Sequence, residues 1–151
     1  MYKNILIATD GSEFAQTAFN HGIDLARSMK SAVTVVTVTE LWSALEMAQK
    51  VRSGKTNPTE EYEKHEDEIA NNVLSKSEEI IKSHGLDCEL IHIRDKHPAD
   101  GIIETAEEKG CDLIVMASHG RRAIQKILLG SIASEVLAHS KVPVLVVKKN
   151  N

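Results

Sequence analysis

The segment NILIATDGS (residues 4–12) decides the fold class, because a short run rich in isoleucine leads directly into a polar turn that contains glycine. A continuous apolar run of this length is typical of a parallel strand buried on both faces. We predict that strand over residues 4–8. Four further runs rich in valine and isoleucine predict strands over residues 33–38, 88–93, 113–117 and 142–147. The run over residues 88–93 is the most polar, which indicates an edge strand.

Between these runs, apolar residues recur at intervals of three or four, which predicts helices. The expected apolar face of the first helix consists of Phe14, Ala18, Gly22, Leu25 and Met29. That of the second consists of Ile69, Val73, Ile80 and Ile81, with Ser77 in the same stripe. A third helix begins near Pro98 and a fourth extends from about Ser131 to His139, with Ile132, Val136 and Leu137 as its apolar residues. Gly85 and Gly110 follow the second and third helices, where a left-handed residue often ends a helix.

Strand and helix alternate four times before a final strand, and such alternation implies right-handed crossovers and a parallel sheet. We therefore predict an α/β protein with a single domain over residues 1–151. Its core is expected to be an open five-stranded parallel sheet of Rossmann type, with helices on both faces.

Composition excludes several classes of function. The chain has 151 residues, a net charge of −4 and only 3% aromatic residues, and it shows no basic stripe, so a nucleic-acid partner is not expected. No apolar stretch approaches the ~20 residues that a membrane-spanning helix needs, so no membrane partner is expected. The apolar run near the N-terminus is too short for a signal peptide. We expect a cytoplasmic protein.

Ligands of open α/β sheets bind beside the carboxyl ends of the strands. The turn after the fourth predicted strand contains Ser118, His119 and Gly120, and after nine intervening residues Gly130 and Ser131 begin a helix. A glycine-containing loop at a helix N-terminus presents free N–H groups to a phosphate, although neither the P-loop pattern nor GxGxxG is present. In the turn after the first strand, Asp10 is either an acceptor for a ribose or adenine group or a helix cap.

Residues 112–147 resemble the C-terminal signature of the universal stress protein family, and the opening MYKNILIATDGS resembles that family's first strand and turn. The ATP-binding branch of the family carries Gly-x2-Gly-x9-Gly-Ser/Thr, which is matched at Gly120, Gly130 and Ser131 and followed by the strand sequence VPVLV. The first glycine of the motif is Ala117 here, and Lys96 replaces a glycine two residues before Pro98.

The resemblance implies an adenine nucleotide α-hydrolase-like fold and a bound adenine nucleotide, ATP or AMP, with Mg²⁺ able to join through the phosphates. It also implies a homodimer joined through the last strand, residues 142–147. The cofactor-binding residues that it implies are Asp10 and the backbone of Val38 at the adenosine with Ala8 and Thr9 beside them, Met116 and Ala117 at the ribose, and Gly120, Gly130, Ser131 and Ile132 at the phosphates.

Enzymatic function is less favoured. Seven histidines lie scattered without the spacing of metal ligands, so no metal site is predicted. Ser118 and His119 with Asp10 have the residue types of a hydrolytic triad. However, GxSxG is absent, and adjacent Ser and His side chains are not expected to face one another. No catalytic residue is nominated, and slow ATP hydrolysis is the most that we expect.

Two alternatives to a nucleotide-binding stress-response module stay open. One is a dimer of the ATP-independent branch of the same family. The other is a phospho-acceptor receiver-like signalling domain, in which Asp10, Asp95 and Ser118 follow the first, third and fourth strands. No feature of the sequence points to a particular protein partner.

Overall fold

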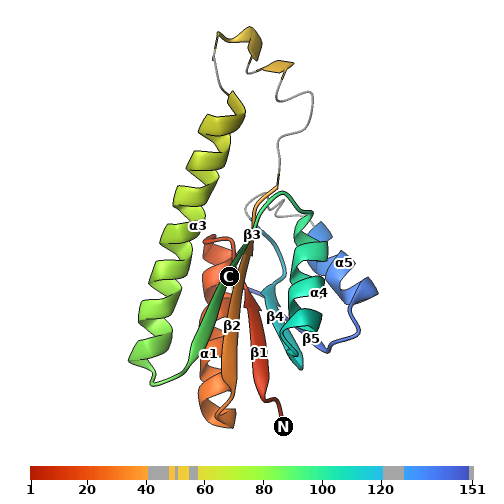
Figure 1. Ribbon diagram of the computed structural model, residues 1–151. Coiled ribbons are helices and arrows are strands. Elements are labelled where there is room, and N and C mark those ends of the chain that lie inside the picture. Colours follow the sequence, from red (N-terminus) through yellow and green to blue (C-terminus); the bar gives the residue numbers. More distant parts are fainter. Residues whose placement is uncertain (41–47, 50, 55–57, 121–127, 150–151) are drawn as a thin grey trace.

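The computed structural model describes residues 1–40, 48–49, 51–54, 58–120 and 128–149. Five strands in these ranges form one parallel sheet in the order β3-β2-β1-β4-β5 (Figure 1). The strands are β1 (Asn4–Ala8), β2 (Ala32–Val38), β3 (Cys88–Ile93), β4 (Leu113–Ala117) and β5 (Val144–Val147). The predicted five-stranded parallel sheet is confirmed, and β3 is an edge strand as its polar sequence indicated.

Helices connect the strands and cover both faces of the sheet, as predicted. They are α1 (Glu13–Met29), α3 (Pro58–Ser83), α4 (Pro98–Glu108) and α5 (Ser131–His139). The helices α1 and α3 lie on one face, and α4 and α5 lie on the other (Figure 1). Neighbouring side chains of a strand point to opposite faces, so each strand contributes to two separate cores.

The central strand β1 shows this division. Ile5 and Ile7 pack under α1 and α3 with Phe19. Leu6 and Ala8 pack under α4 and α5. Because β1 is buried on both sides, its sequence is continuously apolar rather than alternating.

The predicted apolar face of α1 was partly wrong. The buried side chains are Ala15, Ala18, Phe19, Gly22, Ile23 and Ala26. Phe14, Leu25 and Met29 are only partly buried. The small residues occupy the centre of the contact because α1 approaches the sheet closely, whereas the larger predicted residues lie along its flank. In α3 the buried residues include Ala70 and Leu74, one position removed from the predicted Ile69 and Val73. In α5, Leu137 is exposed while Ala133 and Val136 are buried.

The last strand also begins later than predicted, at Val144 instead of residue 142. Pro143 has no N–H to donate, which confines it to the border of a strand. Its carbonyl oxygen still accepts the N–H of Ile114 at 2.9 Å, so the residue positions β5 without belonging to it.

Helix ends follow the expected chemistry. Ser12 caps α1, because its hydroxyl oxygen accepts the N–H of Ala15 at 3.2 Å. Gly85 and Gly110 have φ values of 70° and 62°, as predicted for left-handed residues after α3 and α4. Lys30 takes the same role after α1 with a φ of 56°.

Gly22 tests the close approach of α1 to the sheet. A Cβ atom at this position would lie 2.7 Å from Ile7 Cδ1 and 3.4 Å from Val115 Cγ1. We expect Gly22→Val to lower the free energy of unfolding by about 1–3 kcal/mol, since Ile7 must shift inside a fully buried core to make room for the added side chain. Urea unfolding with an unchanged m-value measures the loss. His21→Val is the matched control on the exposed side of the helix, and an equal loss there would contradict the close-packing explanation.

Candidate functional site

The carboxyl ends of β1 and β4 lie side by side at the point where the chain changes direction across the sheet. From β1 the chain continues through α1 to β2 on one side, and β4 pairs with β1 on the other side. The two turns that come after these strands therefore meet at the edge of the sheet where α/β proteins bind ligands.

The turn after β1 is held by its own side chains. Asp10 Oδ1 accepts the N–H of Ser12 at 2.9 Å, and Thr9 Oγ1 accepts the N–H of Gly11 at 3.3 Å. Because Ser12 caps α1, Asp10 is not the helix cap itself. Its carboxylate is fixed by the turn, so it has a defined direction at the end of β1.

The turn after β4 is fixed through its backbone. Ser118 donates its N–H to the carbonyl oxygen of Val147 at 3.0 Å, and its own carbonyl accepts the N–H of Gly130 at 2.7 Å. Gly130 is the N-cap of α5, with φ −68° and ψ 160° and no side-chain cap. The first N–H groups of α5 therefore start directly beside the turn, at the positive end of the helix dipole.

Two glycines allow the turns to approach each other. A Cβ atom at Gly120 would lie 3.1 Å from Asp10 Oδ2, and one at Gly130 would lie 2.8 Å from the Ser118 carbonyl oxygen. The glycine loop is thus in contact with the acidic turn of β1. Of the residues between Gly120 and Gly130, 121–127 lie outside the described residues.

The structure gathers most of the predicted site residues on the α4–α5 side of the sheet. Ala8 and Met116 are buried there, and Val38 and Ile132 pack against the same core. Val38 also contacts α4, because Gly101 leaves room for its methyl groups. Thr9 is anchored by a hydrogen bond from its N–H to the Val36 carbonyl oxygen at 3.0 Å. Ser131 is exposed at the first turn of α5.

Ala117 stands apart from this group. It comes after Met116 in β4, so strand alternation turns its methyl group toward the α1 side, the side of Leu113 and Val115. The alanine that replaces the first glycine of the motif therefore does not narrow the α4–α5 side.

The expectation that Ser118 and His119 would not face one another was wrong. The Ser118 hydroxyl lies 3.0 Å from His119 Nδ1, because β4 ends at Ala117 and the side chains beyond it no longer alternate between the two faces of the sheet. His119 also lies against Phe14, with 5.6 Å between the ring centroids. Ser118 is only 3% exposed, so its hydroxyl is closed to a substrate. The pair thus lies within the turn after β4, with the serine inside and the histidine partly exposed.

The strand order argues against a receiver-like domain. In receiver domains the order 2-1-3-4-5 places β3 beside β1. Here β2 separates β3 from β1, and Asp95 comes after the edge strand. Two strand spacings of about 4.8 Å separate the ends of β1 and β3, so the expected cluster of Asp10 with Asp95 is not formed.

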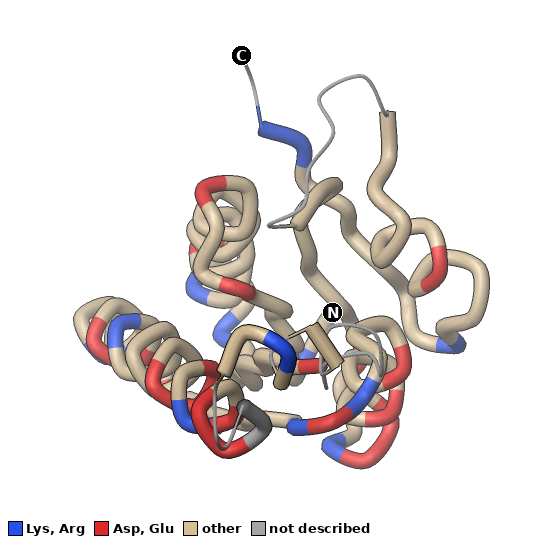
Figure 2. Tube along the Cα trace, turned by 90° about the horizontal axis from the view of Figure 1, so that it is seen from above, with Lys and Arg blue, Asp and Glu red and all other residues tan. Residues whose placement is uncertain are grey.

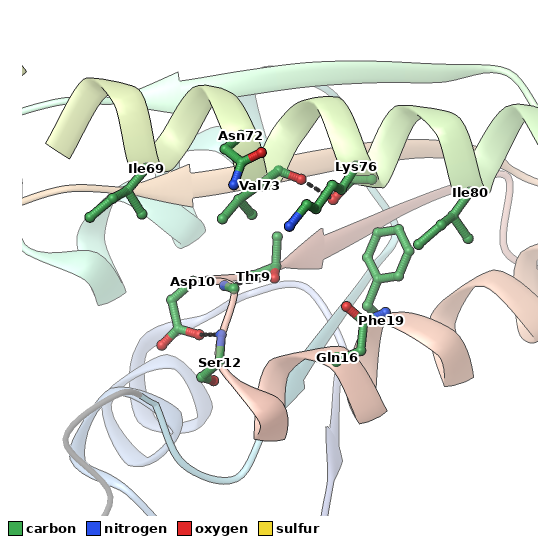
Figure 3. Close-up of a pocket in the computed structure, with 12 residues that line it drawn as sticks. Thr9, Asp10, Ser12, Gln16, Phe19, Ile69, Asn72, Val73, Lys76 and Ile80 are labelled. Carbon is green, nitrogen blue, oxygen red and sulfur yellow. Dashed lines mark hydrogen bonds between the residues drawn. The ribbon is translucent and has the colours of Figure 1, made fainter. Parts of the chain in front are cut away.

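A cavity of about 510 Å³ opens on the other side of the β1–α1 turn, between α1 and α3 (Figure 3). Its lining combines apolar side chains with the polar turn: Thr9, Asp10, Gly11, Ser12, Gln16, Phe19, Ile69, Asn72, Val73, Lys76, Ser77 and Ile80. Of the predicted site residues, only Thr9 and Asp10 line it. The cavity is therefore distinct from the α4–α5 side, where the other predicted residues gather.

Sequence reasoning missed a polar network between Glu40, His97 and Glu135, in which the His97 ring nitrogens lie 3.2 Å from Glu40 and 2.5 Å from Glu135. Pro98 marks the start of α4, so a histidine at the N-cap position could have been noticed. Its two carboxylate partners lie 57 and 38 residues away in sequence, and no local pattern reveals them.

Charge is spread over the molecule. Lys and Arg are interspersed with Asp and Glu along the helices that surround the sheet (Figure 2). Within the described ranges, no three His, Cys, Asp or Glu residues are grouped as metal ligands would be. None of the helices in the part of the chain that the structure describes has the length and hydropathy that crossing a membrane requires.

The comparison with known families decides the identity. The model of the universal stress protein family matches residues 1–148. The chain belongs to the universal stress protein family. The resemblance recognised from the sequence is thus confirmed over nearly the whole chain.

Relatives and solved structures agree. Universal stress protein MJ0531 of Methanocaldococcus jannaschii is 33% identical over 149 residues, which cover 99% of this chain and 84% of that protein. The structure of MJ0577, from the same organism, has a TM-score of 0.80 at 31% identity and covers 100% of this chain and 99% of that chain. A universal stress protein from Archaeoglobus fulgidus in complex with dAMP has a TM-score of 0.66 at 23% identity, with coverage of 96% and 97%. At that identity the likeness establishes the shared fold.

The two site glycines should differ in their effect on stability. We expect Gly130→Ala to cost about 1–3 kcal/mol of unfolding free energy, because the added methyl group meets the backbone oxygen of Ser118 at 2.8 Å. Gly120→Ala is the matched control, since its added methyl group would lie 3.1 Å from a single side-chain oxygen of Asp10, a contact that a shift of a few tenths of an ångström relieves. Urea unfolding of both variants distinguishes them. A Gly120→Ala variant as unstable as Gly130→Ala would contradict the described packing of the two turns.

Proposed function

We propose that this universal stress protein binds an adenine nucleotide, ATP or AMP, in the crevice between the turns of β1 and β4 and the start of α5. One observation carries the proposal. The N-terminus of α5, which has no side-chain cap, is bonded through Gly130 to the turn of β4, while Gly120 brings the same loop against Asp10. A carboxylate held by its turn and a cluster of backbone N–H groups are thus brought to the same edge of the sheet.

The phosphate end of this arrangement is α5. Its first N–H groups and the exposed Ser131 hydroxyl are donors, and the helix dipole favours negative charge at this end. A side chain at Gly120 would crowd the Asp10 carboxylate, and a side chain at Gly130 would crowd the Ser118 carbonyl oxygen. Mg²⁺ joins such a site through the phosphate oxygens.

The adenosine end is the turn of β1 and the end of β2. Asp10 is the acceptor for a ribose hydroxyl or the adenine amine, and the backbone of Val38 lines the same side. Ala8 and Met116 form an apolar floor that excludes water beneath the base and sugar. A fold relative from Archaeoglobus fulgidus in complex with dAMP, itself an adenine nucleotide, agrees with this class of ligand.

Binding without fast turnover is the role that this chemistry favours. Ser118 is buried at the turn, and its hydroxyl is engaged with His119. Nucleotide occupancy would instead change the contacts between the turn after β4 and the start of α5, which makes the protein a regulatory module. If no nucleotide binds, the protein belongs instead to the ATP-independent branch of the family.

We also propose a homodimer through β5. This strand pairs with β4 along one edge, and all four of its residues are partly exposed although they are Val, Leu, Val and Val. An apolar edge strand left bare invites pairing with other chains. Pairing with a second copy covers that edge.

Replacement of Asp10 tests the nucleotide site. We expect Asp10→Ala to weaken ATP binding by about 1.5–3 kcal/mol, the worth of a hydrogen bond to a charged group, or roughly 10- to 150-fold in Kd. Asp10→Asn keeps an oxygen for the Ser12 N–H and so separates the ligand contact from the turn. Isothermal titration calorimetry measures both variants. An unaltered protein that binds neither ATP, ADP nor AMP at about millimolar concentration overturns the proposal.

Charges on the edge strand test the dimer. We expect the double substitution Val144→Lys and Val146→Lys to give monomers, since two cations would face their copies across the paired edge. Light scattering coupled to size-exclusion chromatography gives the mass. Leu137→Lys, on the exposed side of α5, is the matched control and should remain dimeric. A monomeric mass for the unaltered protein would contradict the proposed dimer. Circular dichroism is the check that the variants are still folded.

A further inference from the structure

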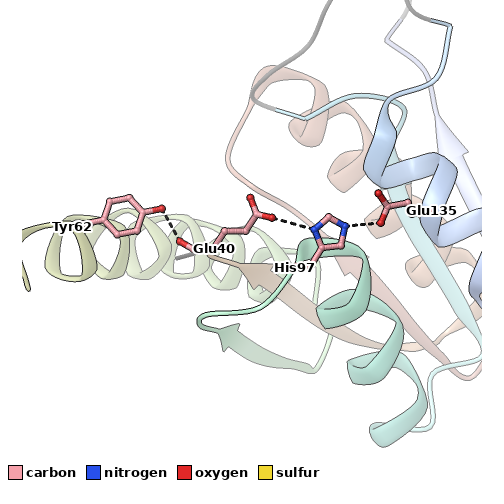
Figure 4. A network of polar contacts seen from close by, with 4 residues as sticks. All are labelled: Glu40, Tyr62, His97 and Glu135. Carbon is pink, nitrogen blue, oxygen red and sulfur yellow. Dashed lines mark hydrogen bonds and ion pairs between the residues drawn. The ribbon is translucent and has the colours of Figure 1, made fainter. Parts of the chain in front are cut away.

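His97 lies between two carboxylates, one at each ring nitrogen. Its Nδ1 is 3.2 Å from Glu40 Oε1, and its Nε2 is 2.5 Å from Glu135 Oε2 (Figure 4). The residue is the N-cap of α4 but makes no side-chain cap bond to that helix. Its imidazole is instead turned outward to the two glutamates, so local helix capping does not account for its orientation.

The three side chains come from three different parts of the fold. Glu40 lies just past the end of β2, two residues after Val38; His97 precedes α4; and Glu135 lies in α5, four residues after Ser131. The Tyr62 hydroxyl of α3 donates to the Glu40 carbonyl oxygen at 2.7 Å, which steadies that end of the bridge (Figure 4). The imidazole therefore joins the adenosine end of the proposed crevice to the helix that forms its phosphate end.

Only one protonation state satisfies both contacts. A neutral imidazole has one N–H and one lone pair, so one glutamate would face a lone pair. An imidazolium donates to both carboxylates, and such charged hydrogen bonds are stronger than neutral ones. The hydrogen bond to Glu135 raises the pKa of His97 above its ordinary value, with a further contribution from Glu40, while partial burial opposes the rise.

The basic residue next to His97 in sequence does not compete for its carboxylates. Lys96 is paired with Glu104. The side chains of His97, Glu40 and Glu135 are each 41–45% exposed, so water and salt moderate the bridge. Among the described residues, the charged and titratable groups of the elements that meet at the bridge are as follows: Glu40 after β2, Tyr62 of α3, Lys96 before α4, Asp100 and Glu104 of α4, and Glu135 and His139 of α5.

We propose that His97 is a positioning residue that in its doubly protonated form holds α5 against the end of β2 and thereby makes nucleotide affinity depend on pH. The proposal rests on the proposed function and adds its regulation. Because the pKa of His97 is raised in the folded protein, the bridge is complete at low pH and is lost as the pH rises through that pKa. Nucleotide binding is therefore tightest in mildly acidic conditions and weakens above neutrality.

Calorimetric titration with ATP between about pH 5.5 and about pH 9 tests the inference on the full chain. We expect the unaltered protein to lose roughly fivefold or more in affinity across this range, at the lower end of typical coupling between sites. His97→Gln and Glu135→Gln should bind more weakly at low pH and should keep only the pH dependence that comes from ATP itself. The phosphates of ATP titrate in the same range, so the variants are compared with the unaltered protein at each pH. His21→Gln, at an exposed histidine of α1, controls for the loss of a histidine and should behave as the unaltered protein does.

The outcomes are separable. Identical pH profiles for the unaltered protein and His97→Gln overturn the positioning role while leaving nucleotide binding intact. Absence of ATP binding at every pH overturns the proposed function and this regulation together. An NMR titration of the His97 ring then reports on the bridge alone. A pKa that is raised in the unaltered protein and falls in Glu135→Gln supports the bridge, and a pKa unaffected by Glu135→Gln refutes it.

Discussion

The pairing of β1 with β4, in register from Ile5 with Leu113 to Ile7 with Val115, holds the centre of the molecule together and sets where its other elements lie. Because β1 pairs with β2 on its other edge, it lies at the centre of the sheet and both of its faces are buried. The same pairing places the turns after β1 and β4 next to each other. A site made from these turns needs no long loop to assemble it, since the sheet hydrogen bonds already hold both ends.

Small residues make the helices and turns fit around that sheet. Gly22 lets α1 approach Ile7, and Gly101 lets α4 approach Val38. Gly130 does the same for the start of α5 at the turn of β4. In each case a single methyl group would have to displace a packed neighbour or a backbone oxygen. Close packing of this kind leaves the elements around the proposed site little freedom to move.

Polar contacts then connect the outer ends of the elements. Ser118 ties β4 to both β5 and α5 through its backbone. Farther along α5, His97 joins Glu135 to Glu40 at the end of β2. The helix whose N-terminus is the proposed phosphate site is thus held at two places by different chemistry. The backbone bonds are independent of pH, whereas the proposed histidine bridge depends on the protonation of His97, so the proposed site has one support of each kind.

Sequence alone was sufficient to predict the five strands, their parallel arrangement and the family, because buried parallel strands leave continuous apolar runs and the glycine loop has a long, specific spacing. It also identified the residues of the two turns, since both come directly after a strand. The strand order, the small-residue centre of the α1 face and the contact between Ser118 and His119 were decided by the tertiary structure. These depend on which distant elements pack together, as do the two carboxylates that flank His97. Periodicity indicates roughly which face of a helix or strand is buried, but it does not show which distant residues pack against that face.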